Sequence, residues 1–133
     1  MILATPYPWR EVVQTVLARQ PGTVVEATAV LWERLLPELR LILGDGAFKP
    51  LYSRSLRLTS HSYAWLLPDK VTSVDSDVVA QLTTLLQGQP ALEAEHSSIA
   101  LFVSFFELLA SLIGDELTVR ILCGAWGPWI LKS

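Results

Sequence analysis

The segment Ile99–Ile113 reads IALFVSFFELLASLI and is the most apolar run in the chain. Only Ser104, Glu107 and Ser111 interrupt it. A membrane-spanning helix needs about 18 to 20 predominantly apolar residues, and this run is shorter than that. The run therefore predicts a buried helix rather than a transmembrane segment. A helix that is apolar nearly all round belongs at the centre of its fold.

Outward from this segment, apolar residues recur at spacings of three and four, which predicts helices, and turns rich in glycine and proline separate them. The expected helices span residues 9–20, 23–43, 47–66, a segment capped by Asp75 or Ser76 and ended by Gly88, a segment from about residue 92 to 113, and residues 116–126. The only strand candidate is 71–74, and no internal repeat stands out. The chain is therefore predicted to be all-α, a compact bundle of about six helices forming one domain over residues 1–133.

Two residues fit poorly into the helices predicted around them. Pro37 removes a backbone hydrogen bond inside the second helix, so a kink or a break is expected near Leu36. Glu107 lies in the most apolar segment, where an isolated buried carboxylate is costly. We expect Glu107 to pair with a cation such as Arg120, or to point into an interface or a pocket.

Composition excludes several classes of protein. Of 133 residues, 51% are hydrophobic and 17% charged, with a net charge of −3. This excludes a disordered chain, and it is not the basic balance of a general nucleic-acid binder. Cys123 is the only cysteine, so no internal disulfide framework or cysteine-based zinc site is expected, and Cys123 is predicted to be a small core residue. The N-terminus lacks a secretory pattern, which favours a cytoplasmic location.

Motifs that carry chemistry are incomplete. Glu93 and His96 have the Glu-x-x-His spacing of di-iron bundles, but such sites need a second motif, and the residue three positions before His61 is Leu58. No nucleophile elbow and no phosphate-binding loop occur. We therefore expect no catalytic residues, no metal and no cofactor. A metal-dependent or hydrolytic enzyme is the third hypothesis for function.

A basic stripe is the first candidate binding surface. Arg54, Arg57 and His61 follow one another at spacings of three and four, opposite the apolar face of their predicted helix. Residues 46–68 contain no acid, and residues 1–68 carry 7 basic and 5 acidic side chains against 3 and 8 in residues 69–133. A charged run is usually a solvated face. The functional interpretation is a docking surface for an acidic partner or an anion.

The five tryptophans and the low charge content predict self-association. Small domains bury a smaller fraction of their surface than large ones, so this much apolar surface is expected to meet a second chain. A twofold homodimer is the commonest closed assembly. We expect its interface at Ile99–Ile113 or around Trp126 and Trp129, although each tryptophan could equally fill the core.

A ligand pocket is the alternative use of the same aromatic residues. The predicted pocket lies among the side chains of Phe102, Phe105, Phe106 and the tryptophans, with Glu107 or Arg54 as its polar anchor.

Two stretches carry a resemblance to a known group of proteins. One comprises Gly46-Ala47-Phe48 followed by Leu51, Arg54, Leu56, Leu58 and Ala64-Trp65-Leu66; the other comprises 112–118, LIGDELT, followed by Arg120, Leu122, Ala125 and Trp126. They resemble the two motifs of small uncharacterised bacterial all-helical proteins, a Gly-x-Phe start before Arg-x-Leu-x-Leu, and Ile-Gly-Glu before Leu-Thr, an arginine and a closing Ala-Trp. Here Asp115 adds an acid before Glu116.

The resemblance implies a role as well as a helical fold. Proteins of that group are encoded near signalling components and have no assigned catalytic activity. Together with the composition, it leads us to expect a non-enzymatic protein-interaction or regulatory (adaptor) module in bacterial signalling. A small apolar-ligand sensor is the alternative.

Overall fold

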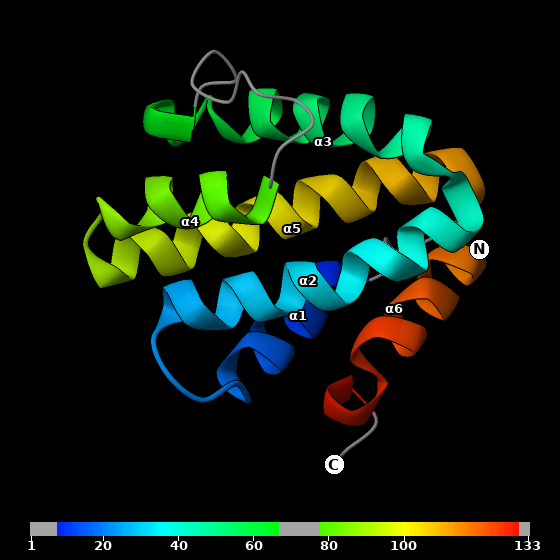
Figure 1. The fold of residues 1–133 in the computed structure, drawn as a ribbon, viewed down its shortest axis with the longest axis horizontal. Coiled ribbons are helices and arrows are strands. Elements are labelled where there is room, and N and C mark those ends of the chain that lie inside the picture. The colour runs from blue at the N-terminus through cyan, green and yellow to red at the C-terminus, as the bar shows by residue number, and fades with distance from the viewer. Residues whose placement is uncertain (1–7, 67–77, 131–133) are drawn as a thin grey trace, which may run out of the picture.

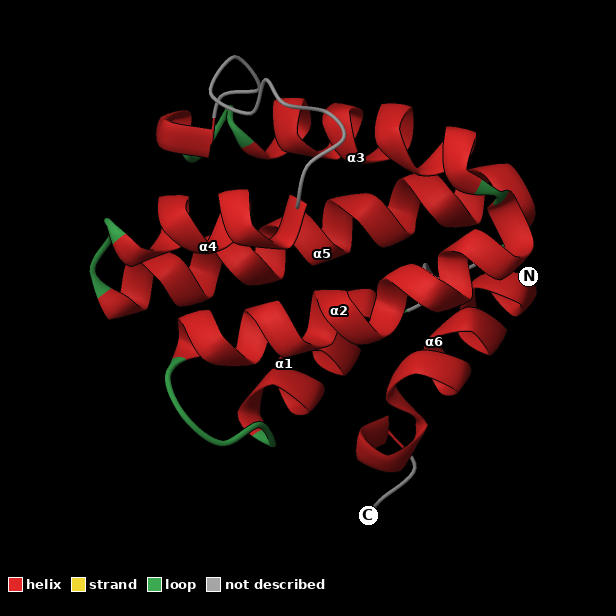
Figure 2. Ribbon diagram, in the orientation of Figure 1, coloured by secondary structure: helices red, strands yellow, loops and turns green. Residues whose placement is uncertain are grey.

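The structure is a computed structural model, and it describes residues 8–66 and 78–130. These residues form six α-helices, a short 3₁₀ turn called η1, and no strand, which confirms the all-α prediction (Figure 2). The helices are α1 (Trp9–Ala18), α2 (Val24–Leu43), α3 (Asp45–Thr59), α4 (Val78–Gln87), α5 (Ala91–Ile113) and α6 (Asp115–Ile130), and η1 is Ala64–Leu66. The strand candidate 71–74 and the caps proposed at Asp75 or Ser76 lie outside the described residues.

Helix α5, which contains the segment Ile99–Ile113, is the central element as predicted. It packs against α1, α2, α3 and α6. Its side chains at Phe102, Phe105 and Phe106 are wholly buried. Among the described residues α5 is also the one helix long and apolar enough to cross a membrane, with a mean hydropathy of 1.7 over its best window. Buried core helices of soluble proteins meet the same criterion.

The other helices are arranged around α2 and α5, which run side by side in the same direction (Figure 1). Helix α3 packs on α5, and α6 packs on α2. Helix α1 packs on α5, and α4 packs on α2. The two long helices therefore form the centre, and each of them is covered mainly by helices from the other half of the chain.

Aromatic rings fill the space between the helices. Trp32 of α2 stacks on Phe102 of α5 with ring centroids 4.5 Å apart. Phe102 meets Trp126 of α6 edge to face at 5.3 Å, and Trp32 meets Tyr52 of α3 in the same way at 5.4 Å. Aromatic pairs of this kind add roughly 0.5–1.5 kcal/mol each beyond the area they bury. One cluster of rings therefore ties α2, α3, α5 and α6 together.

Helix ends follow local hydrogen bonding. Thr23 caps α2 in a complete capping box, because its Oγ1 accepts from the N–H of Glu26 and the Glu26 carboxylate accepts from the N–H of Thr23. Helix α3 ends at Thr59 and not at the predicted residue 66. The Ser60 hydroxyl donates to the carbonyl of Arg57 at 2.7 Å. Such side-chain bonds offer the backbone an alternative to the helix, which accounts for the early end.

Two expectations about individual positions need correction. Helix α2 runs unbroken through Pro37, which is exposed on the outer side of the helix, so the break expected near Leu36 is absent. Helix α6 continues beyond Trp126, although the backbone of Trp126 departs from helical geometry there (φ −123°, ψ 16°).

Candidate functional site

The outer face of α3 brings two of the predicted partner-binding residues together. Arg54 and Arg57 are both exposed and line one surface hollow of about 420 Å³ with Pro50, Ser53 and Leu58. Neither guanidinium has an ion-pair partner among the described residues. Leu58 lies next to Arg57 and contributes an exposed apolar side chain. The hollow therefore combines two exposed cations with one apolar contact.

His61, the third member of the predicted stripe, lies beyond the end of α3. It is exposed in the turn between α3 and η1, and its backbone N–H donates to the carbonyl of Leu58 at 3.3 Å. His61 does not line the hollow in the described residues. The structure thus joins Arg54 with Arg57 and Leu58, and places His61 at the end of the same element.

A planar guanidinium can bind a carboxylate through two parallel hydrogen bonds, which gives geometric selectivity as well as charge attraction. Two such groups three residues apart on a helix face the same side. The α3 hollow is therefore suited to a pair of carboxylates close to an apolar side chain.

The tryptophan prediction fails at Trp126. This side chain is wholly buried, and its Nε1 donates to the carbonyl of Leu31 at 3.0 Å. Trp126 is part of the core and presents no surface to a partner. The backbone of Trp129 belongs to α6, and its side chain lies outside the described residues.

None of the four residues predicted to form a ligand pocket lines a hollow found among the described residues. Phe102, Phe105 and Phe106 are wholly buried and in contact with other rings, for example Phe102 with Phe106 at 5.9 Å. Glu107 points away from this cluster and is exposed, so the expectation of a buried carboxylate was wrong. The helical period explains the outcome, because α5 keeps one narrow side toward solvent and Glu107 and Ser111 lie on it.

A larger groove, which the apolar spacing did not predict, lies away from α3. It lies where α2 and α5 begin and α4 ends, and its volume is about 520 Å³. Its apolar lining consists of Val24, Val25, Ala29, Leu86, Ala91 and Ala94, and its polar lining of Thr23, Glu26, Thr83, Gln87 and Gln89. The short side chains of Ala29, Ala91 and Ala94 leave this space open. Their smallness was the only signal in the sequence, and it is common to many helices.

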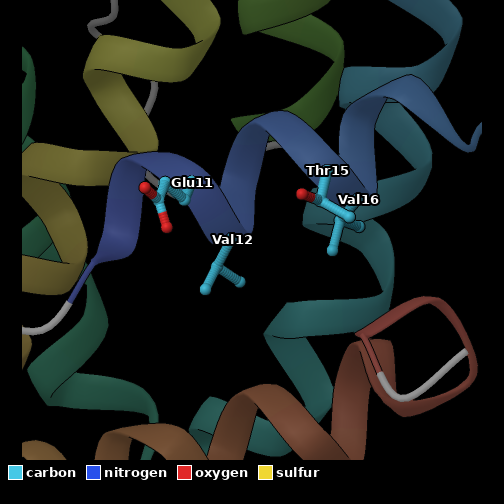
Figure 3. Close-up of a pocket in the computed structure, with 4 residues that line it drawn as sticks. All are labelled: Glu11, Val12, Thr15 and Val16. Carbon is cyan, nitrogen blue, oxygen red and sulfur yellow. The ribbon is translucent and has the colours of Figure 1, made fainter. Parts of the chain in front are cut away.

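Smaller hollows lie along α1. One of about 190 Å³ is lined by Glu11, Val12, Thr15 and Val16, which follow one another along two turns of the helix (Figure 3). Another, of about 210 Å³, lies between the end of α1 and the start of α2 and includes Glu95 of α5. Each combines a single carboxylate with mostly small or apolar neighbours.

Groups that could carry chemistry are dispersed. Glu93 accepts a hydrogen bond from Trp65 Nε1 at 3.2 Å, while His96 is exposed. Within residues 8–66 and 78–130, no three histidine, cysteine or carboxylate side chains are grouped so that they could hold a metal ion.

Burial raises the pKa of Tyr52, so its phenol stays protonated. Cys123 is exposed, contrary to the prediction of a core position.

Comparison of the chain with protein-family models, with curated proteins and with solved structures gives no match.

Proposed function

We propose that this chain is a non-enzymatic protein-interaction module, of the regulatory or adaptor kind, that docks an acidic segment of a partner protein on the outer face of α3. The carrying observation is the hollow in which Arg54, Arg57 and Leu58 meet, where neither guanidinium group has an ion-pair partner among residues 8–66 and 78–130. The sign of the net charge supports the proposal. The chain as a whole carries a net charge of −3, so a cationic surface is a local exception to the overall negative charge. The resemblance to proteins encoded near signalling components points in the same direction.

A partner segment that fits this surface has a defined chemistry. It carries two carboxylates that reach Arg54 and Arg57, and an apolar side chain between them that covers Leu58. An amphipathic acidic helix supplies this pattern at spacings of three and four. Opposite charges across such a surface mainly accelerate association and select the partner.

Binding of a synthetic peptide tests the proposal. The probe is a fluorescein-labelled acidic amphipathic peptide with leucines between glutamates at helical spacing, followed by fluorescence anisotropy. We expect the double variant Arg54→Glu/Arg57→Glu to lose at least about tenfold in affinity, which corresponds to roughly 1.4 kcal/mol. The matched control is Arg10→Glu/Arg120→Glu, which changes the net charge equally at two exposed arginines elsewhere. It should retain wild-type affinity.

Three results would contradict this function. The first is that the two double variants weaken binding equally, which would mean that only net charge matters. The second is that a peptide with glutamine in place of every glutamate binds as well as the acidic peptide. Phosphatidylserine vesicles or duplex DNA could displace the peptide at equal charge concentration, which would make α3 a general anion-binding surface.

A second candidate function, a sensor of small apolar ligands, is favoured by the groove between α2, α4 and α5. Its volume of about 520 Å³ falls in the range of roughly 300–1,000 Å³ that is usual for ligand sites. We expect the dye 1-anilinonaphthalene-8-sulfonate to bind there and to gain fluorescence. Ala91→Trp, which fills the groove, should abolish the gain. The control Leu92→Trp adds the same side chain at the next residue, which is exposed and does not line the groove. Equal fluorescence in both variants would exclude this groove.

A further inference from the structure

The two halves of the described chain correspond helix by helix. Helices α1, α2 and α3 have lengths of 10, 20 and 15 residues, and α4, α5 and α6 have 10, 23 and 16. The corner between α2 and α3 is Gly44, with φ 81°, and the corner between α5 and α6 is Gly114, with φ 91°. An aspartate follows each of these glycines. A shift of 70 positions therefore places one corner on the other.

Burial follows the same shift. From Ala27 to Leu56, every buried residue of α2 and α3 has a buried counterpart 70 positions later. The buried residues are Ala27, Thr28, Leu31, Trp32, Leu35, Leu39, Phe48, Leu51, Tyr52, Ser55 and Leu56, and their counterparts are Ser97, Ser98, Leu101, Phe102, Phe105, Leu109, Thr118, Ile121, Leu122, Ala125 and Trp126. Only two of these pairs are identical, both of them leucine, so the correspondence lies in burial and hardly in residue type.

Two residues contact their own counterparts. The hydroxyl of Thr28 donates to Oγ of Ser98 at 3.1 Å, and Trp32 stacks on Phe102 at 4.5 Å. In a twofold assembly, a residue touches its own copy only at the symmetry axis. These two contacts therefore mark an approximate twofold axis between α2 and α5.

The four most extensive helix contacts obey the reciprocal rule of a twofold interface, in which a contact from element i to element j is matched by one from j to i, whereas the contacts of α1 with α2 and α6 have no comparable counterpart at α4. Helix α3 packs on α5 and its counterpart α6 packs on α2, while α1 packs on α5 and its counterpart α4 packs on α2 (Figure 1). Each three-helix half covers the long helix of the other half. Neither half buries its own long helix alone.

We infer that residues 8–66 and 78–130 are two copies of one three-helix unit, paired within a single chain in the way that the subunits of an intertwined twofold dimer pair. The surface that each unit presents to the other is thus an interaction surface for a second copy of the same unit. This pairing also accounts for the high apolar content of the chain, because each unit buries its apolar surface against the other unit.

The outer faces of the two units differ, although the inner faces correspond. The counterparts of Arg54 and Arg57 are Gly124 and Gly127. Gly124 is exposed like Arg54, whereas Gly127 is buried and follows the non-helical backbone of Trp126, so the cationic pair belongs to the first unit alone. The inference about the repeat rests on core contacts and is independent of the proposed function.

Reciprocal exchange of side chains across the axis tests the inference in the full chain. Trp32→Phe and Phe102→Trp each disturb the packing, one by leaving a void and the other by overfilling. In the double variant, each of the two side chains occupies the equivalent environment of the other. The melting temperature followed by circular dichroism should therefore return to within about 4 °C of wild type. The control exchange Trp32→Phe/Phe105→Trp uses a ring pair in contact at 5.3 Å that the axis does not relate. It should remain about 10 °C below wild type.

A milder exchange decides the matter if the tryptophan variants do not fold. Thr28→Ser/Ser98→Thr exchanges the hydroxyl pair on the axis and should leave the melting temperature unchanged. Thr59→Ser/Ser104→Thr exchanges a pair whose hydroxyls lie 3.4 Å apart and which the axis does not relate, and it should lower the melting temperature. The inference is overturned if the exchanges across the axis cost as much as the control exchanges.

Discussion

Phe105→Asp is expected to unfold the chain. Phe105 is wholly buried and its ring meets Trp32, Phe48 and Phe106 at 5.3–6.0 Å. Removing a core phenylalanine costs roughly 3–5 kcal/mol, and leaving a carboxylate without a partner in an apolar site costs several more. The sum approaches the whole stability of a typical domain, about 5–15 kcal/mol. Far-UV circular dichroism at 25 °C should show the loss of helix directly.

Leu112→Asp is the matched control for this prediction. Leu112 lies on the same helix, α5, and is 69% exposed, so the same substitution should leave the helical signal intact. The pair of variants also separates a core position from a dimer interface. A folded Phe105→Asp variant that merely dissociates from a dimer would show that the helix is covered by a second chain, and it would contradict the packing described above.

The second large effect is expected at the two helix corners. Gly44 (φ 81°, ψ 169°) and Gly114 (φ 91°, ψ 156°) adopt a backbone conformation that residues with a Cβ atom rarely take. Each substitution by alanine should cost about 1–3 kcal/mol of unfolding free energy, since such strain is of that order. Equilibrium urea unfolding of the two single variants and the double variant measures the loss.

Gly46→Ala provides the reference for the corner glycines. Gly46 lies in the first turn of α3, its φ is not positive, and a Cβ atom there meets nothing within 4 Å. Alanine forms helices better than glycine, so this variant should be at least as stable as wild type. A loss at Gly46 as large as the loss at Gly44 would show that the cost comes from removing any glycine near the corner and not from the positive φ.

The exposure of Arg54 and Arg57 also bears on the proposed docking surface. Both side chains are exposed on α3, and substitutions at such surface positions usually change stability by no more than about 0.5 kcal/mol. We therefore expect the Arg54→Glu/Arg57→Glu variant to melt close to wild type while it loses the acidic peptide. This combination of outcomes separates a binding role from a structural one.

Apolar spacing in the sequence was sufficient to predict six helices and the central position of Ile99–Ile113. Glycine corners at Gly44 and Gly114 also placed the ends of α2 and α5 correctly, because a helix ends where the backbone must take a positive φ. The end of α3 was missed, since the hydroxyl of Ser60 competes with the helix and this competition has no periodic signature.

What the sequence determined by itself is which face of each helix is apolar, and this was enough to predict the fold class. What only the tertiary structure decided is which helix covers that face. It put Trp126 in the core and Glu107 in solvent, opened the groove between α2, α4 and α5, and paired Thr28 with Ser98 and Trp32 with Phe102. The physical reason is that burial of apolar surface is non-directional, so a spacing pattern specifies that a face must be covered and leaves the choice of partner to shape and packing.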